Sequence, residues 1–304
     1  GNTSALRYVT FNTTTDIFSG DIEIQNVGSG IPAFPFTDIS VDSNNIPHIT
    51  WIDINTNMGA DYFTVYYTNK VGGSWNTAVQ IEGATAQKDC EDPAITIDSD
   101  NLPCIAYFND TDNAITCAKG NVNNATSFTL FDVEIDAAIS SDISSICVDI
   151  NGNHWIAYIE NDTFVYLRQH IKADPWTTWQ SRTTNSKVGV LGVSAIAEST
   201  TIYIFYENNL NDIVYDRYNG SWLGETALEV GSYRSPRAKW GFWVDRDSTG
   251  TNRGNSRGRL KIDYAFRDEQ IAEGTDIWFN SLAPWITPPI NQPTSANFNQ
   301  IVSV

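Results

Sequence analysis

One short pattern recurs down the chain and constrains the fold more than any other feature. Each copy is an apolar strand that ends in an acid, then a polar turn, then a second strand that carries an aromatic residue and ends in an acid or amide. The first copy runs from Ile39 to Asp42 and from Ile49 to Asp53. The anchoring acids lie 56, 51, 49 and 47 residues apart and are Asp42, Asp98, Asp149, Glu198 and Asp245. A repeat of about fifty residues, made only of short strands and turns, predicts the four-stranded blades of an all-β propeller.

The predicted number of blades follows from the two ends of the chain. Tyr8–Phe11 followed by Phe18 matches Tyr166–Gln169 followed by Trp176, so the N-terminus is predicted to supply the last two strands of a blade. We expect a single domain of six blades, the sixth closed by strands from both termini; five blades with an extra hairpin is the alternative. The predicted blades are 36–83, 92–136, 142–185, 190–231 and 239–285, with a closing blade of 1–35 plus 286–304.

Composition and charge limit the class of protein and the partners that it can bind. The chain is 41% apolar and holds 10 Trp, 13 Tyr and 14 Phe, which is enough to fill the cores between blades. A net charge of −18 and a pI near 4.3 disfavour nucleic acid and anionic membranes as partners. No apolar run reaches the roughly 18 residues of a membrane span. We therefore expect an acidic, extracellular or cell-surface protein without membrane insertion.

The four cysteines, Cys90, Cys104, Cys117 and Cys147, show no CxxC spacing, so the sequence predicts no zinc site. Cys104 and Cys117 fall on consecutive strands of the second blade, across a short turn. They are a candidate disulfide, and two small buried thiols are the alternative.

An aromatic residue opens the fourth strand of each of the five predicted blades between residues 36 and 285. Such a side chain is expected to pack between neighbouring blades rather than to contact a ligand. These residues are Trp75, Phe128, Trp176, Trp222 and Trp285.

Two turns carry a resemblance to known proteins. Ser40–Ile49 (SVDSNNIPHI) and Thr96–Pro103 (TIDSDNLP) resemble the repeats of secreted bacterial and archaeal β-propellers of the sialidase-like, Asp-box (BNR-type) group. The sequence departs from the sialidase Asp-box, in which glycine follows the acid at two positions. The resemblance implies the fold and an extracellular setting, and it carries no activity with it.

Acids and amides gather at one predicted face of the ring. Loops between second and third strands, and links between blades, form that face and are the usual place for a ligand. Three interpretations stay open: acids that only cap strands, a calcium site of roughly six to eight oxygen ligands, or a glycosidase pair of carboxylates. The candidate residues are Asp53, Asn109, Glu160, Glu207 and Asp268 at second-strand ends, and Asp38, Asp92 and Asp142 at inner-strand entries.

The turns that follow Asp98 and Asp149 are similar to fragments of calcium-binding loops but lack the terminal glutamate. An Asp in such a turn more often accepts hydrogen bonds from the backbone N–H groups of its own turn, and we expect that arrangement here. Calcium remains a possible cofactor for which the sequence defines no ligand set.

Half of the positive charge lies in one segment. Nine of the 18 Lys and Arg residues fall between 234 and 267. Arg234, Arg237, Lys239 and Arg267 are predicted to reach the same face as the acids, where forked guanidinium groups suit a sugar carboxylate or sulfate. Internal pairing with Asp and Glu is the alternative.

Repetition favours binding over catalysis, because similar sites in successive blades suit weak multivalent recognition. The sequence predicts an extracellular binding module for a glycan or a cell-surface partner, with no catalytic residue assigned. One alternative is a glycoside hydrolase or lyase that acts on an acidic sugar through the acids and arginines named above. Another is a structural segment of a larger surface or virion protein.

Overall fold

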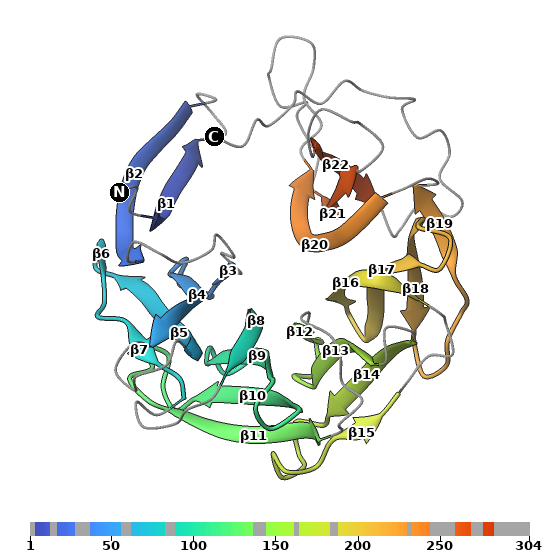
Figure 1. Ribbon diagram of the computed structural model, residues 1–304, viewed down its shortest axis with the longest axis horizontal. Helices are drawn as coiled ribbons and strands as arrows, with labels where there is room; N and C mark the ends of the chain where they lie inside the picture. The colour runs from blue at the N-terminus through green and yellow to red at the C-terminus, as the bar shows by residue number, and fades with distance from the viewer. Residues whose placement is uncertain are drawn as a thin grey trace. The chain divides into compact units, whose positions relative to one another are not determined.

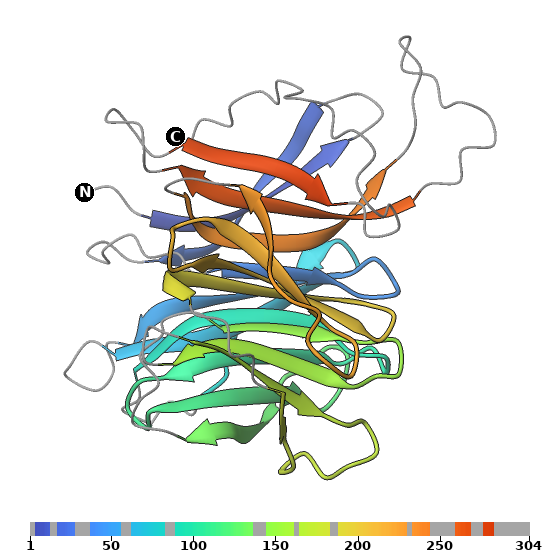
Figure 2. The same ribbon diagram turned by 90° about the vertical axis from the view of Figure 1, so that its right-hand side faces the viewer.

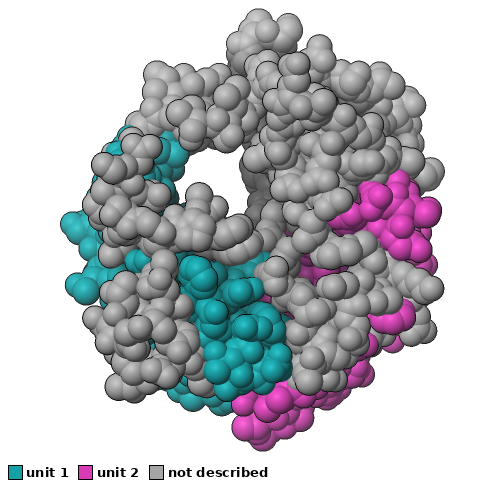
Figure 3. All heavy atoms as spheres, viewed as in Figure 1, with its two compact units in different colours: residues 1–131 teal, residues 132–304 magenta. Residues whose placement is uncertain are grey.

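The chain divides into two compact units, residues 1–131 and residues 132–304, which Figure 3 shows in two colours. For the strands between 233 and 282 the structure gives backbone pairing only. The computed structural model describes residues 4–12, 17–27, 37–55, 62–82, 89–135, 144–160, 164–182, 188–229, 233–243, 259–268 and 276–282.

Unit 1 is built of strands, the last of which runs on into unit 2 (Figure 1). They are β1 (Ser4–Asn12), β2 (Ile17–Val27), β3 (Thr37–Val41), β4 (Pro47–Asn55), β5 (Tyr62–Val71), β6 (Ser74–Trp75), β7 (Val79–Gln80), β8 (Cys90–Ile97), β9 (Pro103–Asn109), β10 (Ala114–Gly120) and β11 (Phe128–Ile135).

Unit 2 is built in the same way. Its strands are β12 (Ser144–Val148), β13 (His154–Glu160), β14 (Phe164–His170), β15 (Gln180–Ser181), β16 (Val188–Glu198), β17 (Thr201–Asn208), β18 (Ile213–Tyr218), β19 (Thr226–Glu229), β20 (Tyr233–Trp243), β21 (Arg259–Asp268) and β22 (Asp276–Leu282).

Strands that follow one another in sequence pair antiparallel within each sheet, as Figures 1 and 2 show. The sheets run β1-β2, β3-β4-β5-β6 with β7 also on β5, β8 to β11, β12 to β15, β16 to β19, and β20 to β22. The predicted all-β class is confirmed, and the described residues contain no helix. No helix that could cross a bilayer is therefore found in this part of the chain.

The recurring acid builds the turn between the first two strands of a sheet. Between β3 and β4, Asp42 Oδ1 accepts the backbone N–H groups of Asn44 and Ile46, at 2.8 Å each. The backbone of the turn closes in both directions, because Asn45 N–H donates to the Asp42 carbonyl and Asp42 N–H donates to the Ile46 carbonyl, each at 3.0 Å. Asn45 has a φ of 61°, a left-handed conformation that asparagine tolerates.

The same turn recurs at two later acids. Asp98 Oδ1 accepts the N–H groups of the residues two and four positions later, at 2.9 and 2.8 Å. Asp149 Oδ1 does the same at 2.9 Å each. The prediction that these acids bind their own turns is confirmed. Two backbone N–H donors therefore contact the Oδ1 oxygen of each of these acids.

In two of the anchoring acids a carboxylate oxygen ties the turn to the next strand. In unit 2, Trp155 Nε1–H donates to Asp149 Oδ2 at 3.1 Å. The Tyr203 hydroxyl donates to Glu198 Oε2 at 3.0 Å. Asp149 therefore serves its own turn and the strand that follows, which gives a physical reason for an acid at this position of the repeat.

Apolar side chains from neighbouring sheets pack together in each unit. In unit 1, Tyr67, Ile95 and Ile105 are buried in one such cluster, and Phe128 packs against it. In unit 2, Trp222 packs against the corresponding cluster of the β12–β15 and β16–β19 sheets. Packing of the fourth-strand aromatic is thus confirmed for Phe128 and Trp222, and burying each large side chain stabilises the fold by about 2 kcal/mol.

The candidate disulfide between Cys104 and Cys117 is not formed in this structure, so this prediction was wrong. All four cysteines are buried free thiols. In the β9–β10 pairing, Cys104 lies opposite Lys119, and Cys117 lies opposite Ala106, so the two cysteines are diagonal neighbours rather than partners. Diagonal positions are roughly 7–8 Å apart at Cα, which is too far for an unstrained disulfide. The alternative prediction, that both residues are small buried thiols, is confirmed.

The predicted closing blade involves residues 286–304, which lie outside the described part of the chain. The number of blades and the blade boundaries remain predictions. The N-terminal strands β1 and β2 pair with each other, and Tyr8 of β1 contacts Trp75 of β6 edge-on at a ring distance of 5.1 Å.

Candidate functional site

The strand register decides which residues occupy equivalent places at the end of the second strand. In three sheets the turn closes on a matching pair, with Val41 opposite Pro47, Ile97 opposite Pro103 and Val148 opposite His154. Counting six residues onward from the second member of each pair gives Asp53, Asn109 and Glu160.

The fourth sheet departs from the predicted alignment by one residue. Its turn closes with Ala197 opposite Ile202, so the same count reaches Asn208. Glu207, which the sequence pattern favoured, lies on the other face of β17. The prediction was wrong because this turn, between Glu198 and Thr201, is shorter than the others. A one-residue slip moves every side chain to the opposite face of a sheet.

In unit 1 the end of the second strand forms a buried polar cluster, the Glu82 cluster, of Glu82, Tyr107 and Asn109. The Tyr107 hydroxyl donates to Glu82 Oε1 at 2.8 Å, and Asn109 Nδ2 donates to the same oxygen at 3.5 Å. The three residues are 4%, 0% and 1% exposed. Burial, with the charge of Glu82 as a second cause, raises the pKa of Tyr107 well above its usual range. Tyr107 is therefore a permanent donor that compensates the buried carboxylate.

Unit 2 builds the same arrangement from a different part of the chain. Tyr206 and Asn208, at the positions of Tyr107 and Asn109, donate to Glu225 Oε2 and Oε1 at 3.0 Å each. Glu225 comes from the β18–β19 loop and is exposed, unlike Glu82. The sequence analysis missed Tyr107, Tyr206, Glu82 and Glu225. The register of the Tyr–x–Asn pattern relative to the turn was the signal that could have found the two tyrosines.

A third tyrosine at this strand position also contacts a glutamate. The Tyr158 hydroxyl donates to Glu134 Oε2 at 3.5 Å, and Arg168 pairs with the same oxygen. The Arg168 guanidinium lies over the Tyr158 ring, 6.0 Å from its centre. A tyrosine hydroxyl held by a carboxylate is thus repeated at three strand ends.

The loops beyond Asn109 and Asn208 share one design. Asn109 Oδ1 accepts the N–H of Asp112 at 3.1 Å, and Asn208 Oδ1 accepts those of Leu210 and Asp212 at 2.9 and 3.0 Å. The residues between are exposed. The buried asparagine therefore fixes the loop, and the loop presents acids and amides to solvent.

Asp38 and Asp92, which were nominated as ligand residues, have structural positions. Asp38 Oδ2 accepts the backbone N–H of Ile95, at 2.9 Å, and so joins β3 to β8. In unit 2 the hydroxyl of Ser145 accepts the N–H of Ala195 at the same distance and joins β12 to β16. Asp92 is 3% exposed and has a φ of 45° at an irregular step in the β8–β9 pairing.

The other nominated residues are only partly described. Asp53 is half-buried, opposite Thr64, and after burial its charge is the second cause that raises the pKa of Tyr66. Asp142 lies outside the described residues. Backbone positions alone are described for Glu160, Arg234, Arg237, Lys239, Arg267 and Asp268.

The backbone register brings two of these arginines together. Arg234 of β20 lies directly opposite Arg267 of β21, and Arg237 lies opposite Ala265 after a register shift. Lys239 lies opposite Asp263, at a position where internal pairing with an acid is available. Like charges in directly opposed positions destabilise an antiparallel pair unless an anion compensates them.

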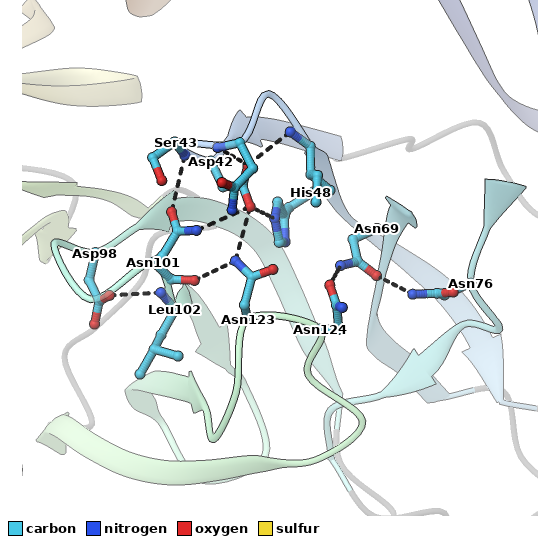
Figure 4. Close-up of polar contacts among 12 residues, drawn as sticks. Asp42, Ser43, His48, Asn69, Asn76, Asp98, Asn101, Leu102, Asn123 and Asn124 are labelled. Atoms are coloured by element: carbon cyan, nitrogen blue, oxygen red, sulfur yellow. Dashed lines mark hydrogen bonds and ion pairs between the residues drawn. The ribbon is translucent and has the colours of Figure 1, made fainter. Parts of the chain in front are cut away.

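A second polar cluster, centred on Asp42, lies at the other ends of the strands in unit 1 (Figure 4). Asp42 Oδ2 accepts from Asn123 Nδ2 at 3.0 Å and from Asn101 Nδ2 at 3.3 Å, and it faces His48 Nε2 at 3.5 Å. His48 Nδ1 is hydrogen-bonded to the Tyr67 hydroxyl at 2.6 Å. This Asp42 cluster links the β3–β4 turn to the β8–β9 turn and to the β10–β11 loop.

Electrostatics fix the charge states in the Asp42 cluster. Burial raises the pKa of Asp42, but hydrogen bonds from Ile46 N–H, Asn123 and Asn44 N–H outweigh it and bring the pKa to about 2. Burial lowers the pKa of His48, against the opposing effect of Asp42. The site is therefore an ionised carboxylate beside a neutral imidazole, and neither side chain is exposed.

A short chain of amides continues from this cluster toward solvent (Figure 4). Asn76 Nδ2 donates to Asn69 Oδ1 at 2.7 Å, and Asn69 Nδ2 donates to Asn124 Oδ1 at 2.8 Å. Asn69 is buried, whereas Asn124 is exposed. A chain of amide hydrogen bonds of this kind holds the loops in place, which gives the cluster an architectural role.

No protein-family model matches the sequence, and no curated protein sequence matches it. The fold is similar to a polysaccharide lyase, the PL25 ulvan lyase, with 10% identity and a TM-score of 0.57 over 91% of this chain and 74% of that one. A Penicillium chrysogenum α-L-arabinanase is 11% identical, with a TM-score of 0.52 over 91% and 85% of the two chains.

A fucose-specific lectin from Aleuria aurantia is 12% identical, with a TM-score of 0.52 over 87% of this chain and 78% of that one. Sialidases are among the similar structures as well. At such low identity the likeness shows the fold, and the chain has the fold of a β-propeller.

Proposed function

We propose that this protein is a carbohydrate-binding β-propeller that uses the loops after its second strands. The observation that carries the proposal is the repeated strand end: Tyr107 with Asn109, and Tyr206 with Asn208, each held by a glutamate and each followed by an exposed polar loop. Planar amides can both donate to and accept from neighbouring hydroxyl groups, and carboxylates can accept from them, which suits the hydroxyl groups of a sugar. The structurally similar lectin and arabinanase bear names that refer to sugars.

Similarity between the two strand ends supports binding rather than catalysis. An active site requires unlike residues in fixed roles around one reacting atom. Several weak and similar sites instead gain affinity by binding a branched or repeated ligand at more than one point. An acidic, extracellular protein that binds glycans on a cell surface or on a surface protein fits this proposal, alone or as part of a larger assembly.

The test compares loop variants on an array of oligosaccharides. Asp110→Ala and Asn209→Ala each remove an exposed polar side chain at the tip of one loop, and Asp132→Ala removes an exposed acid from strand β11 as the matched control. We expect each loop variant to lose roughly fivefold in affinity, the value of about one hydrogen bond, and the control to bind as wild type. Unchanged binding by both loop variants contradicts the proposal.

A second candidate is an enzyme that cleaves an acidic polysaccharide. The observation that favours it is the directly opposed register of Arg234 and Arg267, which suits a carboxylate or sulfate. The parallel assay measures reducing ends released from neutral and from acidic polysaccharides. Release from an acidic substrate, abolished by Arg267→Gln, would establish the enzyme and displace the binding module.

A further inference from the structure

A compact group of aromatic rings lies on unit 2, away from the loops considered above. It belongs to the end of the sheet where β14 stops at His170, and the loop 171–179 leads to β15. Trp176 and Trp179 are in this loop, and both indoles are partly exposed. His154 and His170, 3% and 1% exposed, lie beneath them.

The rings contact one another in defined orientations. Trp176 stacks on His170 with a centroid distance of 4.3 Å and an interplanar angle of 20°. His154 meets Trp176 edge-on at 4.7 Å. Trp179 is tilted against His170 at 5.3 Å and is nearly perpendicular to Trp176 at 6.1 Å. Buried imidazoles therefore support one side of each indole, and the remaining ring surface reaches solvent.

Trp176 differs from the aromatic residues at the same place in other sheets. Phe128 and Trp222 pack against the apolar clusters between sheets, and Trp222 Nε1–H donates to the Arg182 carbonyl at 2.9 Å. Trp176 is not among the residues of those described clusters; it packs on the two histidines of its own sheet. The prediction of packing between blades therefore stays a prediction for Trp176, whose described ring contacts are with His154, His170 and Trp179.

Hydrogen bonds within the loop hold it in shape. His170 Nε2 is bonded to the Asp174 carbonyl at 3.2 Å, and Trp179 Nε1–H donates to the Trp176 carbonyl at 3.0 Å. Asp174 N–H and Thr178 N–H close two turns at 2.9 and 2.8 Å. A binding surface that is ordered beforehand loses little conformational entropy when a ligand arrives.

We propose that Trp176 and Trp179 form a stacking subsite for one pyranose ring of a glycan. The apolar C–H face of a pyranose suits a rigid indole, and exposed groups around the rings, including the hydroxyls of Thr177 and Thr178, can meet its hydroxyl groups. This subsite rests on the proposed function and adds a second kind of contact in unit 2, at the opposite strand ends from the loop 208–212. The ligand is thus a chain or branched glycan with a hexopyranose unit.

The experiment measures binding of fucose-, galactose- and glucose-containing oligosaccharides to the full chain by calorimetry. Trp179→Ala is expected to weaken binding by roughly tenfold, and Trp179→Phe, which keeps a smaller aromatic face, by less. Leu223→Ala is the matched control, because Leu223 is an apolar side chain, 48% exposed, in the corresponding loop of the next sheet. Thermal unfolding confirms that each variant is folded.

A measurement on the unaltered protein is independent of folding effects. Indole oxidation by N-bromosuccinimide, mapped by peptide mass spectrometry, should be slowed at Trp176 and Trp179 by the bound oligosaccharide and unchanged at Trp75. If the glycan binds but neither protection nor loss in Trp179→Ala is seen, the subsite is refuted while the proposed function stands. If no oligosaccharide binds the wild-type chain, both proposals fall.

Discussion

Replacing Asp42 with asparagine tests the architectural role of the Asp42 cluster. The Asp42 carboxylate accepts two backbone N–H groups of its own turn and two side-chain amides from Asn101 and Asn123. Asparagine keeps one acceptor oxygen, which can serve the turn. Its NH₂ group would then face the amide donors of Asn101 and Asn123, and these half-buried groups would lose the Asp42 oxygen as an acceptor, while Asn123 keeps its hydrogen bond to the Asn101 carbonyl.

The size of the effect follows from the pKa. A carboxyl group whose pKa falls from 3.8 in the unfolded chain to about 2 in the folded protein stabilises the fold at neutral pH by about 2 kcal/mol. This figure already includes the hydrogen bonds from Asn123 and the turn N–H groups, because they are what lower the pKa. We expect Asp42→Asn to lower the free energy of unfolding by about 2 kcal/mol, measured by urea denaturation at pH 7. Asp132→Asn, the same change at an exposed acid, should cost less than about 0.5 kcal/mol.

The pH dependence gives an independent check with a definite sign. Since the folded pKa lies below the unfolded one, the unfolded chain binds more protons, and the contribution of Asp42 is lost as pH falls from about 4 to about 2. Asp42→Asn should lack this part of the wild-type acid transition. Equal losses in Asp42→Asn and Asp132→Asn would refute the reasoning.

Three further predictions concern single buried groups. Burial lowers the pKa of His48, so the unfolded chain protonates first and stability falls as pH drops below about 6.5; His48→Gln should flatten this slope in urea titrations between pH 7 and 5. Glu82→Gln should destabilise the fold by roughly 1–3 kcal/mol in denaturant melts, because the Tyr107 hydroxyl and an amide lose a charged acceptor; an unchanged midpoint would contradict it. Burial raises the pKa of Cys104 well above its usual range and that of Cys117 to about 12. Both thiols should therefore resist a thiol reagent until the protein is unfolded. A Cys104–Cys117 cross-linked peptide under non-reducing conditions would disprove this.

Local turn chemistry explains what could be predicted of the fold. The sequence from Asp42 to Ile46 determines its own hydrogen bonds, since the side-chain oxygen reaches N–H groups two and four residues away. A repeat of such turns, with apolar strands on both sides, sufficed for the all-β class and for the propeller. The shorter turn after Glu198 was the exception, and there a missing residue shifted the whole strand.

The candidate site was harder to predict because its residues combine segments distant in sequence. Glu82 joins Tyr107 across 25 residues, and Asn123 joins Asp42 across 81. Nothing in the spacing of Glu82 or Asn123 marks them. Acids at strand ends were conspicuous in the sequence, yet Asp38 serves a neighbouring backbone, and this role depends on the packing of two sheets.

The bond from Ile95 N–H to Asp38 and its counterpart from Ala195 N–H to Ser145 suggest how such a chain can lengthen. The donor is main chain, which every residue except proline possesses, and the acceptor is either a carboxylate or a hydroxyl. A duplicated copy of the gene segment for one sheet would therefore arrive with its own attachment point. The neighbouring sheet would need only a single oxygen-bearing side chain to bind the added sheet in the correct register.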